Sequence, residues 1–171
     1  ASWCFPPVLF VGICSCAAAL LFGSSPFCPS LLAADHGALA DEVNRMLDEG
    51  ADWLHVDIMD GHFVENLTVG PSVVADLARR AGPRDVFFDC HLSVTNPAAL
   101  VPALERAGAS SVTFHVEVAS GADAVALCES IRSRGMRAAV ACAPSTPCDA
   151  PGGVYDLCDA GLVDMVLCLS V

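Results

Sequence analysis

Downstream of residue 26, short apolar runs alternate with longer segments in which apolar residues recur at helical spacing. Leu39, Val43 and Met46, for example, form a single stripe along one such segment. Glycines follow the helical segments at intervals of 32, 26, 27 and 26 residues, at Gly50, Gly82, Gly108, Gly135 and Gly161. Because glycine suits the left-handed conformation after a last helical turn, the pattern predicts a repeating unit of one strand and one helix.

The apolar runs predict six strands, near Cys28–Leu32, Trp53–Met59, Val86–Leu92, Ser111–Glu117, Met136–Ala141 and Asp164–Leu169. Strands that alternate with helices at this spacing pair in parallel through right-handed crossovers. The order predicts an α/β fold of the (βα)8 TIM-barrel type, incomplete, with about six of the eight strand–helix units present. Pro71 and Pro97 are expected at helix starts, and Pro151-Gly152-Gly153 is expected to break the helix of the fifth unit.

Side chains alternate between the two faces of a strand, and on three neighbouring predicted strands the two faces differ in character. One face is apolar and suits packing against helices: Leu54, Val56, Ile58, Phe88, Cys90, Leu92, Val112 and Phe114. The other face carries most of the polar groups: His55, Asp57, Asp89, His91, Thr113, His115 and Glu117. α/β barrels build their active sites at the carboxyl ends of the strands, so this polar face is the candidate functional site.

Within this face, His55, Asp57 and His91 are predicted to form a divalent-metal site. Imidazole and carboxylate ligands together suit Zn, Fe, Mn or Co. The alternative is a set of satisfied core polar groups, and the convergence of three groups from adjacent strands favours the metal site. The role of His115 stays open at this point, and Glu117 is interpreted as a solvated charge at a strand end.

Outside this set, Ser30 lies at the end of the first predicted strand and is a candidate donor to a substrate oxygen. The Asp60-Gly61 pair is interpreted as a turn. Eight basic and twenty acidic residues give a formal net charge of −12, which argues against a nucleic-acid surface. The ten cysteines contain no C-x-x-C unit and most lie in apolar runs, which indicates free thiols and a cytoplasmic location.

Residues 1–26 differ from the rest and are assigned to a separate apolar N-terminal segment. The run from Val8 to Phe22 is shorter than the ~20 residues of a comfortable membrane span, so no stable span is predicted. It resembles the centre of a signal peptide, but no positively charged region precedes it. We interpret it either as the remnant of a targeting segment, which leaves a plastid location as the alternative to the cytoplasm, or as an upstream stretch that does not belong to the protein. The barrel domain is placed at residues 27–171.

Several segments are similar to one enzyme family: PSLLAAD (Pro29–Asp35), GADWLHVDIMDGHFVENLTVGP (Gly50–Pro71), DCHLSVTNP (Asp89–Pro97), AGASSVTFHVE (Ala107–Glu117) and LVDMVLCLSV (Leu162–Val171). With them the chain resembles the ribulose-phosphate 3-epimerases, which are (βα)8 barrels of the pentose phosphate pathway and the Calvin cycle. These enzymes interconvert D-ribulose 5-phosphate and D-xylulose 5-phosphate. One carboxylate removes the C3 proton, a metal ion stabilises the enediolate, and a second carboxylate returns a proton.

The resemblance implies roles for individual residues. His55, Asp57 and His91 match three of the family's four metal ligands, which bind one divalent ion, and Asp57 also matches one of two acid/base aspartates. Ser30, Met59 and His91 match residues of the substrate pocket. The implied partner is a small sugar phosphate, and the family commonly assembles into homo-oligomers.

The chain also departs from the family pattern. The second catalytic aspartate and the phosphate-binding backbone belong to the seventh and eighth strands, which the sequence to Val171 does not contain, and Ser93 and Leu169 replace pocket methionines. The expectation is a C-terminally truncated relative with impaired activity. Two alternatives stay open: a related 3-epimerase for another ketose phosphate such as a hexulose 6-phosphate, and a non-catalytic fragment of a barrel.

Overall fold

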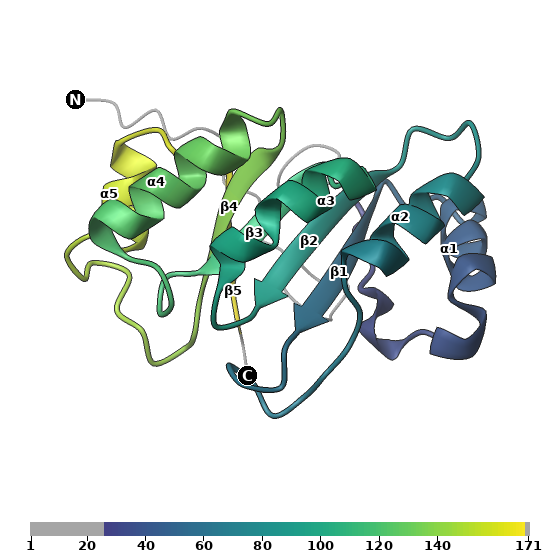
Figure 1. Cartoon of the computed structure of the whole chain (residues 1–171), viewed down its shortest axis with the longest axis horizontal. Coiled ribbons are helices and arrows are strands. Elements are labelled where there is room, and N and C mark those ends of the chain that lie inside the picture. The colour runs from purple at the N-terminus through teal and green to yellow at the C-terminus, as the bar shows by residue number, and fades with distance from the viewer. Residues whose placement is uncertain (1–25, 170–171) are drawn as a thin grey trace.

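Five parallel strands form one sheet in chain order in the computed structural model, which describes residues 26–169 (Figure 1). The strands are β1 (Trp53–Met59), β2 (Phe87–Ser93), β3 (Ser111–His115), β4 (Arg137–Cys142) and β5 (Met165–Cys168). The helices are α1 (Leu39–Asp48), α2 (Pro71–Arg80), α3 (Val101–Ala107), α4 (Gly121–Arg132) and α5 (Val154–Asp159). Three short 3-10 helices are η1 (Leu31–Ala33), η2 (His36–Ala38) and η3 (Pro97–Ala99). This alternation confirms the predicted fold class, an incomplete parallel α/β barrel.

The predicted helix boundaries have local causes. Pro71 is the first residue of α2, where its missing N–H costs nothing, and the Asn96 side chain accepts a hydrogen bond from the Ala99 N–H and caps η3. All the glycines that were predicted to end helices have positive φ: Gly50 at 96°, Gly82 at 70°, Gly108 at 87°, Gly135 at 80° and Gly161 at 65°. The strand–helix repeat is therefore punctuated as the sequence predicts.

The first predicted strand, Cys28–Leu32, is not a strand in the structure. It makes a single parallel bridge, between Ser30 and His55, and the Pro29 carbonyl accepts a hydrogen bond from the His55 N–H. Pro29 has no N–H to continue a ladder, and the Ser30 hydroxyl accepts from the Leu32 N–H and caps η1. The chain thus turns away after one bridge, so the prediction of six strands was wrong by this one.

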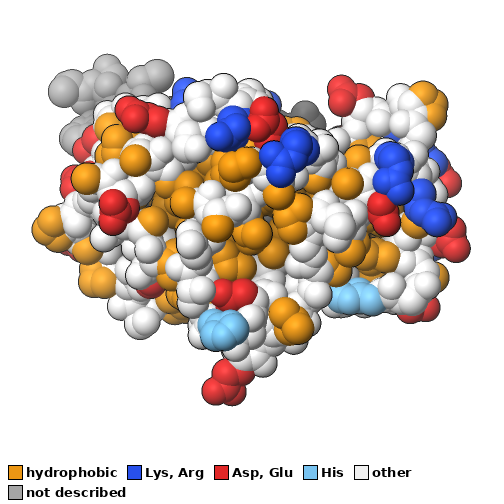
Figure 2. All heavy atoms as spheres, in the orientation of Figure 1, with side chains coloured by type: hydrophobic (Ala, Val, Ile, Leu, Met, Phe, Trp, Pro, Cys, Tyr) orange, Lys and Arg blue, Asp and Glu red, His pale blue; other side chains and the backbone are white. Residues whose placement is uncertain are grey.

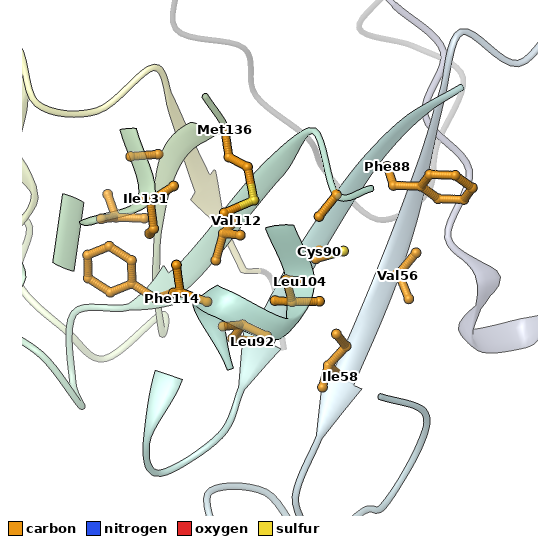
Figure 3. Packing of buried hydrophobic residues seen from close by; sticks show 14 of the residues in the cluster. Val56, Ile58, Phe88, Cys90, Leu92, Leu104, Val112, Phe114, Ile131 and Met136 are labelled. Atoms are coloured by element: carbon orange, nitrogen blue, oxygen red, sulfur yellow. The ribbon is translucent and has the colours of Figure 1, made fainter. Parts of the chain in front are cut away.

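The helix-facing side of the sheet holds the main hydrophobic core (Figure 3). Its strand residues include all those of the predicted apolar face, and its helix residues include Val43, Val74, Leu104, Leu127 and Ile131. Figure 1 shows α2, α3 and α4 lying across this face of the strands. Burying each large aliphatic or aromatic side chain contributes about 1.5–3 kcal/mol, so this core fixes the strands and leaves their opposite face for polar groups.

The segment between β4 and α5 contacts the start of α4 through two glycines. The Gly121 N–H donates to the Gly152 carbonyl oxygen at 2.9 Å. A Cβ on Gly152 would lie 2.6 Å from the Gly121 Cα, and Gly152 has a φ of 71°. Only glycine fits there. Pro151-Gly152-Gly153 was predicted to break the fifth helix, but in the structure it precedes that helix, because α5 begins at Val154.

The outer surface of the described residues carries paired charges. On the face in Figure 2, basic side chains (blue) lie beside acidic ones (red). The ion pairs of the molecule include Arg79–Asp76 within α2 and Arg134–Glu105, both 2.7 Å long. Within residues 26–169, no helix combines the length and the hydropathy needed to cross a membrane. Seven cysteines in this part of the chain are free thiols, as expected. The N-terminal segment lies almost entirely outside the described residues, so its predicted role stays a prediction.

Candidate metal centre

Two adjacent strands bring together the residues predicted to bind metal. His55 and Asp57 lie two residues apart on β1 and so share a face, and the parallel register places Asp57 opposite His91 of β2. Each of the three side chains offers one ligand atom, and these atoms all lie within 4.8 Å of one another. All three residues are buried. The donor set of two imidazoles and one carboxylate can hold a divalent metal ion.

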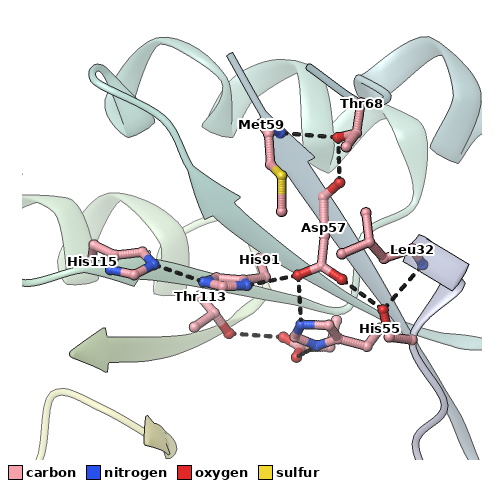
Figure 4. Close-up of polar contacts among 10 residues, drawn as sticks. Leu32, His55, Asp57, Met59, Thr68, His91, Thr113 and His115 are labelled. Atoms are coloured by element: carbon pink, nitrogen blue, oxygen red, sulfur yellow. Dashed lines mark hydrogen bonds and ion pairs between the residues drawn. The ribbon is translucent and has the colours of Figure 1, made fainter. Parts of the chain in front are cut away.

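One oxygen of Asp57 is the centre of this cluster (Figure 4). Asp57 Oδ1 is 3.3 Å from His55 Nε2 and 2.9 Å from His91 Nδ1. The other carboxylate oxygen, Oδ2, accepts a hydrogen bond of 2.6 Å from the Ser30 hydroxyl. The two rings therefore direct one nitrogen each toward the same point, and Ser30 fixes the carboxylate from the other side.

The second nitrogen of His55 is held by a fully buried carboxylate. His55 Nδ1 lies 2.8 Å from Asp89 Oδ2, and the other oxygen of Asp89 accepts a 2.9 Å hydrogen bond from the Thr113 hydroxyl. Asp89 lies on β2, in register with His55 of β1, and has no exposed surface. A carboxylate behind a histidine is the usual way to orient a metal ligand and to fix its tautomer.

The second nitrogen of His91 leads into a longer chain of contacts. His91 Nε2 lies 2.9 Å from His115 Nε2, and His115 Nδ1 lies 3.1 Å from Glu117 Oε2. Glu117 Oε1 in turn accepts a 2.7 Å hydrogen bond from the Ala143 N–H and another from the Thr146 hydroxyl. Glu117 is exposed, as predicted for a solvated charge, but its carboxylate is also held by three groups and links the cluster to the segment after β4.

The charges within the cluster stabilise one another. Burial alone lowers the pKa of His55, but hydrogen bonds to Asp57 and Asp89 and their negative charges outweigh burial and raise this pKa to about 10. Burial raises the pKa of Asp57, whereas hydrogen bonds from His55, His91 and Ser30 hold it well below its usual range. Asp57 is therefore ionised at neutral pH, and a cation that binds His55 competes with its proton.

The other predicted site residues lie at the rim of the cluster. Ser30 contacts Asp57 rather than pointing only toward open space. Met59 is two residues beyond Asp57 on the same face of β1, and its side chain extends toward Asp57 and His91 (Figure 4). The Met59 N–H donates to the Thr68 hydroxyl, which itself donates to the Asp57 carbonyl oxygen. Ser30 and Met59 therefore both lie beside Asp57.

Asp60-Gly61 forms a turn, as the sequence indicates. The Asp60 carboxylate accepts hydrogen bonds from the His62 and Phe63 N–H groups, and Gly61 has a φ of 73°. The Thr95 N–H and hydroxyl both donate to the other carboxylate oxygen, each at 2.8 Å. Asp60 therefore ties the end of β1 to the loop after β2 and does not join the metal-ligand cluster.

Three supporting residues received no role from the sequence: Asp89, Thr113 and His115. The alternation of side chains along the strands placed all three on the polar face, and this was the only signal in the sequence that they belong to the site. What the sequence lacked was the register, which pairs His55 with Asp89 and His91 with Thr113. In the described part of the chain, no buried side-chain nitrogen or oxygen is without a hydrogen-bond partner, so these residues complete the cluster.

Together, the parallel sheet and this cluster define an α/β-barrel protein with a candidate metal centre on two adjacent strands. The chain belongs to the ribulose-phosphate 3 epimerase family, whose sequence model matches residues 27–171.

Curated relatives agree with this assignment. The chain is 46% identical over 144 residues to a protein of Oryza sativa subsp. japonica named ribulose-phosphate 3-epimerase, cytoplasmic isoform, with 84% of this chain and 60% of the relative covered. It is 40% identical over 157 residues to the ribulose-phosphate 3-epimerase of Candida glabrata (84% and 61% covered). It is 45% identical over 125 residues to that of Mycobacterium tuberculosis (73% and 52%). The chain spans about 60% of the length of the first two relatives.

Proposed function

We propose that this chain is the metal- and substrate-binding part of an epimerase that interconverts D-ribulose 5-phosphate and D-xylulose 5-phosphate. The supporting observation is the arrangement of His55, Asp57 and His91, whose ligand atoms lie within 4.8 Å of one another. Membership of the family and the names of the relatives give the reaction class. The reaction is proton transfer at C3 through an enediolate.

His55, Asp57 and His91 would hold the divalent ion of this enzyme, with Zn, Fe, Mn and Co all compatible with the donors. The fit rests on two features of the chain: both rings direct a nitrogen toward Asp57 Oδ1, and each ring has its second nitrogen held by another side chain. When bound, the ion supplies positive charge that stabilises the oxyanion developing on the substrate.

Asp57 is the proposed acid/base residue at C3. It is ionised at neutral pH and can accept a proton, and the Ser30 hydroxyl fixes its Oδ2 at 2.6 Å. Hydrogen bonds from His55 and His91 reduce the basicity of Asp57. A ring nitrogen that binds the metal ion would carry no hydrogen, so it would no longer donate to Asp57. We assign Ser30, Met59 and His91 to the wall that contacts the sugar phosphate.

The expected cellular setting follows from the same assignment. A small sugar phosphate is the proposed partner, and the name of the rice relative supports a cytoplasmic location. The plastid location stays a prediction that cell fractionation tests. Assembly into homo-oligomers stays a prediction that light scattering tests.

The decisive experiment measures exchange of the C3 hydrogen of D-ribulose 5-phosphate with D2O by NMR, with Mn²⁺ supplied. It is run on the chain and on a chimera that continues after residue 169 with the corresponding segment of the rice relative. We expect exchange in the chimera and a loss of about 10²–10⁴-fold in its Asp57→Asn variant. Asp76→Asn, which changes an exposed aspartate of α2, is the matched control. A chimera that binds no Mn²⁺ and exchanges no C3 hydrogen would overturn the proposal.

A further inference from the structure

Two thiols lie in contact beyond the metal centre. Cys142 is the last residue of β4 and is buried, and Cys148 is half-buried in the segment that leads to α5. Their Sγ atoms are 3.9 Å apart, and within residues 26–169 no other pair of cysteines shows such a contact. None of the groups proposed above for metal or substrate binding uses either thiol.

The segment between the two thiols is short and anchored. The Thr146 N–H donates to the Ala143 carbonyl oxygen at 2.9 Å, and the Tyr155 N–H donates to the Cys148 carbonyl oxygen at 3.1 Å. A disulfide needs an S–S separation of about 2.05 Å, so the two sulfurs must approach by about 1.9 Å. Pro144 and Pro147 restrict the backbone of the segment, which keeps the thiols near each other.

We propose that Cys142 and Cys148 form an oxidation site that closes to a disulfide. With hydrogen peroxide as the oxidant, the Cys148 sulfur attacks one peroxide oxygen, the O–O bond breaks, and a sulfenic acid and one water form. The Cys142 sulfur then attacks the Cys148 sulfur, the S–O bond breaks, and hydroxide leaves with the Cys142 proton as a second water. Two thiols and one peroxide thus give one disulfide and two waters.

The environment of the thiols sets this order of events. Burial raises the pKa of Cys142 to about 12, with further contributions from Cys148, Cys168 and Glu117, so Cys142 stays protonated at neutral pH. Cys148 is the more accessible of the two and is therefore the one that meets the oxidant. Cys142 then acts as the resolving thiol.

Closure of this disulfide reaches the metal centre through Glu117. Its Oε1 is bound by the Ala143 N–H and the Thr146 hydroxyl, and both groups belong to the segment that the two thiols enclose. Its Oε2 contacts His115, which contacts His91. Movement of the segment therefore changes how His91 is held. This consequence rests on the proposed function, whereas the disulfide itself does not.

The first measurement locates the disulfide. The chain is treated with hydrogen peroxide, its free thiols are alkylated, and it is cleaved after Arg137 and before Asp149, which releases a peptide with Cys142 and Cys148 as its only cysteines. We expect this peptide to lose the mass of two hydrogens and to escape alkylation. Cys148→Ser should abolish the product, and Cys158→Ser, a half-buried cysteine of α5, should not. An alkylated peptide, or a link from Cys142 to its β5 neighbour Cys168, would overturn the proposal.

The second measurement compares Mn²⁺ affinity before and after oxidation. Mn²⁺ is chosen because hard cations bind thiols poorly. We expect about tenfold weaker binding in the oxidised chain, as for loss of a residue behind a metal ligand, with recovery on reduction. Cys148→Ser should show no change on oxidation. Equal affinities despite a mapped disulfide would overturn the link through Glu117, whereas a reduced chain that binds no Mn²⁺ would instead contradict the proposed function.

Discussion

The face of the sheet opposite the helices, called the inner face below, has two halves of opposite character. On β1, β2 and β3 it carries the histidines and carboxylates of the metal centre. On β4 and β5 the residues in register with Thr113 are Ala139 and Met165, and those in register with His115 are Ala141 and Leu167. All four are buried. In both rows of register partners, the side chains therefore change from polar on β3 to apolar on β4.

The difference shows where this fold tolerates buried charge. A buried polar group costs several kcal/mol unless it has partners, and the groups on β1–β3 supply partners to one another. The four apolar residues on β4 and β5 have no side-chain group that could be a hydrogen-bond partner for a buried charge. The polar half is thus a single hydrogen-bonded unit whose members depend on one another.

The largest expected effect comes from placing a charge in the apolar half. Ala139→Asp introduces a carboxylate at a position with no exposed surface, in register with Thr113 and Met165. With no cation beside it, we expect the free energy of unfolding to fall by about 4 kcal/mol or more, measured by urea denaturation. Ala122→Asp, on the exposed side of α4, is the control and should change it little. A stable Ala139→Asp variant would contradict the division into two halves.

A second, smaller effect is expected from weakening the polar half from behind. Asp89→Asn keeps the size of the side chain but removes the charge that faces His55 Nδ1. We expect Mn²⁺ affinity to fall by about 10–100-fold in titration calorimetry. Thr113→Val removes only the hydroxyl that donates to Asp89 and should have a smaller effect than Asp89→Asn. If the order is reversed, Asp89 does not orient His55.

Strand parity predicted the two faces because alternation is local. It placed His55, Asp57 and His91 on one face, and the structure brings their ligand atoms together. Parity contains no register, however, so it could not show that Asp89 lies behind His55 or that His115 meets His91. Those contacts depend on how separate strands align.

The first strand shows a different limit. Apolar character at Cys28–Leu32 predicted a strand, but the cap that Ser30 forms on η1 decided the outcome. A short polar side chain that can cap a turn competes with the strand ladder, and hydrophobicity does not register that competition.

The smallest effect concerns the turn that ties the polar ends of β1 and β2. Hydrogen bonds from the Thr95 and Phe63 N–H groups hold the pKa of Asp60 well below its usual range. Because the folded-state pKa is depressed, ionised Asp60 stabilises the fold above the unfolded pKa of about 4, and this contribution is lost as pH falls through the lower folded value.

The measurement compares urea midpoints of the native chain and Asp60→Asn across pH. The native chain should be the more stable at pH 5–7, and the gap should shrink below about pH 4. A gap that widens toward acid would show that the charge of Asp60 does not support the turn.

The contact of Gly121 with Gly152 has a consequence for sequence variation. With the φ of 71° at Gly152 and no room for a Cβ, that position admits one residue type. Natural insertions and deletions in this connection should therefore spare Gly152, so that its contact with the start of α4 is kept from one homologue to the next.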